Sequence, residues 1–112
     1  MIEKTILDYL TDALPVPVHM EMPRDPSGLF LVIEKTGSSV ENHIYSATIA
    51  VQSYAPSLLK AAELNEDVKA VMENLARLPK ISRVDLNGDY NFTDLAMHLY
   101  RYQAVFEVIH YE

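Results

Sequence analysis

The stretch HIYSATIAVQSYAPSLLKAAELNEDVKAVMENLARL (residues 43–78) contains the change of hydrophobic period that indicates the fold class. Its first twelve residues, His43 to Tyr54, alternate apolar and polar side chains, which predicts a β-strand with one buried face. After Ser57, which can act as an N-cap, apolar residues recur in steps of three and four, as on one face of an α-helix. This helical stripe comprises Ala61, Leu64, Val68, Val71, Leu75 and Leu78.

The residues before this stretch predict a helix and short strands. Residues 2–14 have apolar side chains at helical spacing, and two prolines follow them. Residues 16–20 alternate as a short strand does, and the apolar residues 29–34 indicate a strand covered on both faces. Residues 36–42, TGSSVEN, are small, polar and too many for a tight hairpin, so we expect a protruding loop there.

Two further strands are predicted after the long helix. Residues 81–86 alternate, Asn87-Gly88-Asp89 has the composition of a turn, and residues 99–111 alternate again. The face expected to be buried in this last strand consists of Tyr100, Tyr102, Ala104, Phe106 and Val108. The predicted order is α-β-β-β-α-β-β. It indicates a single α+β domain over residues 1–112, with a mostly antiparallel sheet and two helices packed on one side of it.

Composition narrows the class of protein. The chain is 49% hydrophobic and 22% charged, which is typical of a globular domain, and its apolar runs are too short to span a membrane. It has no cysteine, so disulfides and thiol chemistry are excluded. Nine basic and sixteen acidic residues give a net charge of −7, which disfavours tight nucleic-acid binding. We expect a cytoplasmic product without a signal peptide or membrane partner.

The sequence contains no catalytic or metal-binding motif. The four histidines, His19, His43, His98 and His110, include no pair spaced i, i+4, and no serine lies in a GxSxG elbow. We therefore predict neither cofactor nor metal, and no enzymatic activity. A site assembled in space from His43, His98 and nearby acids is the alternative of a different class, a small-molecule-binding domain or enzyme.

The C-terminal quarter is rich in tyrosine, with Tyr90, Tyr100, Tyr102 and Tyr111 among the seven in the chain. Tyrosine at alternate strand positions packs in cores and is also favoured at protein–protein interfaces. We interpret Tyr100 and Tyr102 as core residues. Tyr90, in a predicted turn, is equally consistent with an interface.

Two stretches carry a resemblance to a known family. VIEKTGSSVENHIYSATIAVQSYAPSLLKAAELNEDVKAVM (residues 32–72) and ISRVDLNGDYNFTDLAMHLYRYQAVFEVIHY (residues 81–111), with the N-terminal helix, resemble small tail-completion and tail-terminator proteins. These belong to long non-contractile-tailed phages and prophages. The phrases EKTGS…NHIYSATIAVQSYA and YNFTD…YRYQAVFEV carry the likeness, which covers most of the chain by element order.

The resemblance implies a ring, commonly a hexamer, that caps the tail tube and joins it to the head. The implied partners are further copies of the chain, the tail tube protein and the head-closure or connector protein, in the virion neck after assembly in the host cytoplasm. DNA would pass through such a ring. Six copies at −7 each would carry about −42, which suits a channel that does not hold DNA.

A ring needs two different contact surfaces on each subunit. The candidates are the loop and the turn that the sequence predicts. They comprise Thr36, Gly37, Ser38, Ser39, Val40, Glu41 and Asn42, and then Gly88, Asp89, Tyr90, Asn91, Phe92, Thr93 and Asp94. A head-closure or minor capsid protein of the neck is the alternative within the same class.

Overall fold

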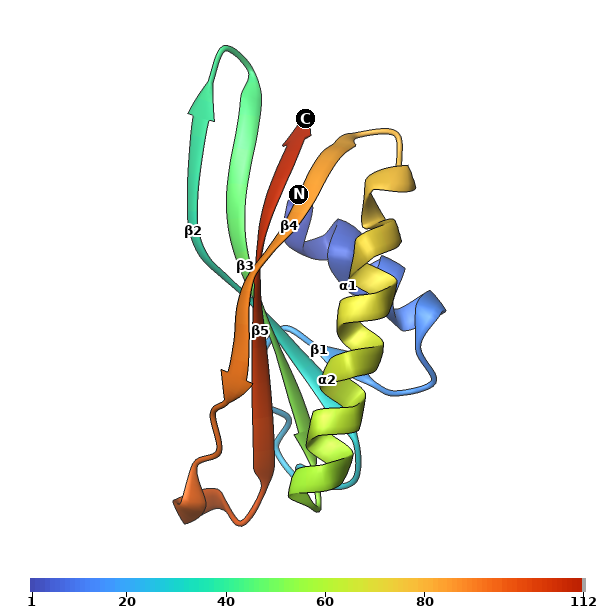
Figure 1. The fold of residues 1–112 in the computed structure, drawn as a ribbon, viewed down its shortest axis with the longest axis vertical. Coiled ribbons are helices and arrows are strands. Elements are labelled where there is room, and N and C mark those ends of the chain that lie inside the picture. Colours follow the sequence, from blue (N-terminus) through green and yellow to red (C-terminus); the bar gives the residue numbers. More distant parts are fainter. Residues whose placement is uncertain (112) are drawn as a thin grey trace.

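The computed structural model describes residues 1–111, with two α-helices and five β-strands in the order α-β-β-β-α-β-β that the sequence predicts (Figure 1). The elements are α1 (Ile2–Ala13), β1 (Val18–His19), β2 (Phe30–Glu41), β3 (Ile44–Ala55), α2 (Leu58–Met72), η1 (Glu73–Arg77), β4 (Ile81–Asn91), η2 (Leu95–Met97) and β5 (Tyr100–Tyr111), where η marks a 3₁₀ helix. Within these residues, neither helix is long and apolar enough to cross a membrane.

The strands form one sheet in the order β1-β2-β3-β5-β4. The two-residue strand β1 is parallel to β2, and every other pair is antiparallel. The four long strands therefore alternate in direction across the sheet. The sheet is elongated, and the molecule measures 44 × 24 × 24 Å along its principal axes.

One face of the sheet and both helices share the main hydrophobic core. Ile33, Val51 and Ala104 are directly opposite one another in β2, β3 and β5, so their side chains project from the same face. They belong to a cluster that also contains residues of both helices. This face is called the helix face below, and the opposite one the open face. The helical members of the cluster are Ile2, Ile6, Leu10, Leu64, Val68, Met72 and, from η1, Leu75.

Local sequence accounts for the long helix. Ser57 is the N-cap of α2, and its hydroxyl accepts a 3.2 Å hydrogen bond from the backbone N–H of Lys60, as expected. The predicted stripe is buried at Ala61, Leu64 and Val68. The α-helix ends at Met72 and continues as the 3₁₀ turn η1, which keeps Leu75 in the core.

The predicted strand at residues 29–34 is buried on both faces from Phe30 to Ile33. On the open face, Phe30 stacks on Tyr54 with ring centroids 4.8 Å apart. His19 contacts the edge of Phe30, and Met22 packs against the same cluster. The segment around β1 therefore covers this part of the open face.

The prediction of a protruding loop at residues 36–42 is wrong, because most of these residues form a strand. Residues 36–41 extend β2, and the chain reverses through a two-residue turn at Asn42 and His43, with φ of 52° and 66°. Two consecutive left-handed residues are typical of a type I′ hairpin turn. Residues 36–46 form a two-stranded hairpin arm, which projects beyond the helices (Figure 1). Length alone was misleading, because most of the polar segment pairs with β3.

The predicted turn at Asn87-Gly88-Asp89 is also wrong. The chain does not reverse there, because β4 continues to Asn91. The register against β5 shifts between Leu86 and Gly88, which marks a β-bulge. Asparagine and glycine tolerate the backbone conformations of a bulge as readily as those of a turn, so composition did not distinguish the two.

The C-terminal strand differs from its predicted burial at one end. Ala104, Phe106 and Val108 are fully buried, as expected. Tyr102 is half-buried, and Tyr100 is exposed rather than part of the core. Tyr100 is the first residue of β5 and pairs with Ala55 at the end of β3, where the sheet ends.

Candidate assembly surfaces

The outer edge of β2 is covered over only part of its length. β1 pairs with Leu31 and Val32, and the N–H of Leu31 also donates to the carbonyl of Pro17 at 2.9 Å. No strand among residues 1–111 pairs with the outer edge from Glu34 to Glu41. Proline and lysine normally protect a strand edge from pairing with another chain. The uncovered part contains Gly37, Ser38 and Ser39, and it has no proline and no lysine beyond Lys35.

The outer edge of β4 is the opposite edge of the sheet. β4 pairs with β5 along its length and, within the described residues, has no partner on its other side. Two register shifts interrupt it, one after Ile81 and one after Leu86. The strand is exposed or half-buried beyond its first residue. An unpaired edge of this length presents a row of backbone donors and acceptors to a neighbour.

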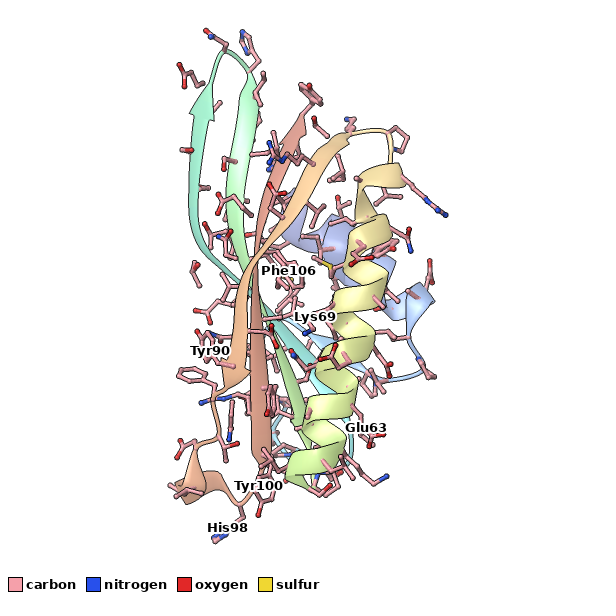
Figure 2. All side chains as sticks on the ribbon, in the orientation of Figure 1. Glu63, Lys69, Tyr90, His98, Tyr100 and Phe106 are labelled. Carbon is pink, nitrogen blue, oxygen red and sulfur yellow. The ribbon has the colours of Figure 1, made fainter. Side chains whose placement is uncertain are left out.

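The two groups of predicted contact residues therefore lie on opposite edges of the sheet. The first group lies in the hairpin arm, with Asn42 in its turn, and the second covers the end of β4 and the start of its connection to β5. Figure 2 shows Tyr90 on the β4 edge, about midway along the molecule. The structure does not bring the two groups together within one chain. It presents them on two sides, as a head-to-tail contact requires.

A chain of hydrogen bonds crosses the open face from β5 to β4. Arg101 Nη1 donates to the hydroxyl of Tyr54 at 2.9 Å, and this hydroxyl donates to Gln52 Oε1 at 3.5 Å. Gln52 Nε2 donates to Gln103 Oε1 at 2.9 Å, and Gln103 Nε2 donates to the hydroxyl of Tyr90 at 2.6 Å. The donors all point toward Tyr90. The Tyr90 oxygen accepts the last of these hydrogen bonds, so the hydroxyl proton of Tyr90 can be donated to a group outside the sheet.

Arg101 holds the predicted contact residue Phe92 against the sheet. Its guanidinium lies 4.3 Å from the centroid of the Phe92 ring, and Nε donates to the Phe92 carbonyl at 2.7 Å. The Phe92 ring in turn contacts the edge of Tyr90, with centroids 5.8 Å apart. Both rings remain more than two-fifths exposed. They form an ordered aromatic patch beside the β4 edge, to which the cation–π contact of Arg101 contributes.

Glu107 organises a second polar group on the open face. Its carboxylate accepts from the hydroxyls of Ser46 at 2.6 Å and Thr48 at 2.9 Å, both in β3. Asn87, at the β4 bulge, donates to the same carboxylate at 3.5 Å. These contacts connect the base of the hairpin arm to β5 and β4.

Asp89 is used inside the fold, although we predicted it as a contact residue. Its Oδ1 accepts from Asn65 Nδ2 at 3.0 Å and from Lys69 Nζ at 3.3 Å, both in α2. Lys69 also pairs with Glu66 at 3.0 Å, and that hydrogen bond is the main reason that the pKa of Lys69 is raised; burial lowers it, and Asp89 raises it further. The cluster fastens the end of β4 to the long helix.

The histidines proposed for a small-molecule site do not come together. His43 lies in the turn of the hairpin arm, and His98 precedes β5 at the opposite end of the molecule (Figure 2). The β3–β5 ladder between them runs from Ile44–Tyr111 to Ala55–Tyr100, which is about 35 Å at 3.3 Å per residue. Nowhere in the described part of the chain do three or more histidine, aspartate or glutamate side chains gather to hold a metal ion.

Sequence reasoning missed the residues that order the β4 edge. Arg101, Gln103 and Glu107 alternate with the residues predicted to be buried in the last strand, but their partners Tyr54, Gln52 and Thr48 were not predicted. The alternation of polar residues in both strands was the available signal. The specific contacts depend on the register between strands far apart in the sequence.

A scan against protein-family models finds no match, and a search of curated proteins finds no significantly similar sequence. The surfaces described above therefore carry the functional proposal.

Proposed function

We propose that this chain is a phage or prophage assembly protein that forms a ring, caps the tail tube and joins the tail to the head. The observation that carries the proposal is the pair of different, uncovered strand edges on opposite sides of one sheet. Different surfaces that meet head to tail generate a ring when the rotation between copies closes, whereas one self-complementary surface generates a dimer.

The ordered state of the second surface supports the same proposal. Tyr90 and Phe92 are held in place by Gln103 and Arg101 before any partner binds. Exposed aromatic side chains that are already ordered lose little conformational entropy on association. The resemblance of residues 32–72 and 81–111 to tail-completion and tail-terminator proteins supplies the tail tube and the head connector as the proposed partners.

The proposal is tested by native mass spectrometry of the purified chain over a concentration series, alone and with the tail tube protein of the same phage. The expected result is a discrete ring, a hexamer in the simplest case, formed alone or with the tube protein. The tube protein of an unrelated phage is the control. A persistent monomer or dimer that ignores the tube protein contradicts the proposal. Binding to the connector alone would favour the head-closure alternative.

A further inference from the structure

We propose that the uncovered outer edge of β2 in one copy pairs antiparallel with the outer edge of β4 in the next copy, so that the sheets of adjacent subunits become continuous. This inference rests on the proposed ring and names the surfaces that build it. The molecule that binds each of these edges is a second copy of this chain.

Strand direction is the first argument. β2, β3, β5 and β4 alternate in direction, so the two outer long strands, β2 and β4, run antiparallel to each other. Two copies placed side by side in the same orientation therefore bring β4 of one beside β2 of the next in the antiparallel sense. The pairing continues the alternation inside each subunit and keeps all helices on one side of the joined sheet.

The register within one chain shows which residues of the two edge strands, β2 and β4, lie in the same row across the sheet. Gly37, Thr48, Glu107 and Asp85 form one row across the sheet. Ser39, Ser46, Ile109 and Arg83 form another. Copies joined without a shift along the strands thus place residues 34–39 of β2 against residues 88–83 of β4. This segment lies within the part of β2 that β1 leaves uncovered.

Side-chain chemistry agrees with this register on the open face. Arg83 comes opposite Ser39 of the next copy, and Glu41 is then its diagonal neighbour, within reach of a long side chain. Gly88 comes opposite Glu34, and the same diagonal relation places the Tyr90 hydroxyl, which has its proton to donate, near the Glu34 carboxylate. The small residues Gly37 and Ser39 leave room beside the Arg83–Asp85 ion pair.

The absence of cysteine from the chain allows a direct test by disulfide cross-linking. The double variant Gly37→Cys/Asp85→Cys cannot close within one chain, because three strand spacings of about 4.8 Å separate the two positions, and a disulfide needs Cα atoms within about 7 Å. A Cβ at Gly37 meets no heavy atom within 4 Å. Mild oxidation should give a ladder of covalent oligomers on a non-reducing gel, up to the ring number.

Two controls make the result specific. Each single variant can give no more than a covalent dimer, and the double variant Gly37→Cys/Lys60→Cys, with its second cysteine on the exposed start of α2, should give no ladder. Circular dichroism and the urea midpoint establish that each variant folds. Dimers from Gly37→Cys alone, without a ladder from the double variant, would indicate symmetric β2–β2 pairing and overturn the inference.

Charge-reversal variants, made without any introduced cysteine, provide a second test of the strand pairing. Arg83→Glu should weaken association about twofold to fivefold per interface, and Arg83→Glu/Glu41→Arg should restore it. Rings of the wild-type chain together with no ladder and no restoration would overturn the strand pairing and leave the proposed function intact. Ladders that never close into a discrete ring would contradict the proposed function and leave the strand pairing intact.

Discussion

Gln52 donates a 2.9 Å hydrogen bond from its side-chain amide to the amide oxygen of Gln103, across the centre of the open face. Both side chains are about 9% exposed. The bond is therefore largely shielded from water and forms the middle of the chain that ends at the hydroxyl of Tyr90. A polar pair at this depth contributes to stability only while both partners are present.

Gln52→Leu should lower the free energy of unfolding by roughly 1–3 kcal/mol, because Gln103 then keeps a buried oxygen without its donor. Gln52→Leu/Gln103→Leu should cost less than the sum of the single variants, because an apolar pair removes both polar groups together. Urea denaturation of the four proteins in a double-mutant cycle measures the difference. Strictly additive losses would show that the two amides do not interact.

Asp89→Ala should destabilise the chain by about 1–3 kcal/mol, because the buried amide of Asn65 loses its acceptor and Lys69 loses an ion-pair partner. Asp67→Ala, which removes an exposed carboxylate of α2, is the matched control and should change stability by less than about 0.5 kcal/mol. Chemical denaturation compares the two. Equal effects would mean that the β4–α2 contact contributes nothing measurable.

His43→Gly should stabilise the hairpin arm by about 0.5–1 kcal/mol, because histidine at φ 66° is in the left-handed region, where glycine has no steric cost. Ser38→Gly, at a position in the same arm without positive φ, should instead be neutral or destabilising. The shift in the urea midpoint distinguishes the two variants. A loss of stability in His43→Gly would argue against the type I′ turn.

Tyr9 adds a pH dependence to stability. Its hydroxyl donates to the carbonyl of Val71, and burial raises its pKa above 10, an effect larger than the opposite one of Arg77. The neutral form is thus favoured in the folded chain. Its contribution is fully present below pH 10 and is lost as the pH rises through the raised pKa.

Tyr9→Phe should lower the free energy of unfolding by about 1 kcal/mol at pH 7, and the difference from the wild type should shrink in strongly alkaline buffer. Unfolding followed at pH 7 and at pH values above 10 tests this expectation. A difference that stays constant across that range would show that Tyr9 does not titrate differently in the folded and unfolded chains.

The candidate surfaces were located only in part from the sequence. Tyr90 and Phe92 were predicted in a turn, as candidate contact residues; both are exposed, but Tyr90 lies in β4 and Phe92 directly follows that strand. Asp89 was placed in the same group because of its neighbours, but it faces α2. The bulge at residues 86–88 lies just before Asp89, and a bulge changes which side chains face the helix.

The sequence by itself determined the order of the elements, the N-cap at Ser57 and the buried face of α2, because hydrophobic period and capping act over a few neighbouring residues. It predicted one buried face for β3, whereas β3 is buried on both faces from Ala50 to Ala55. Only the tertiary structure decided that β5 lies between β3 and β4, that residues 36–41 extend a strand, and that the two candidate surfaces lie on opposite edges. Strand pairing joins residues up to about 67 positions apart, as between Ile44 and Tyr111. No local pattern specifies such a partner, since any alternating strand presents the same backbone groups to its neighbours.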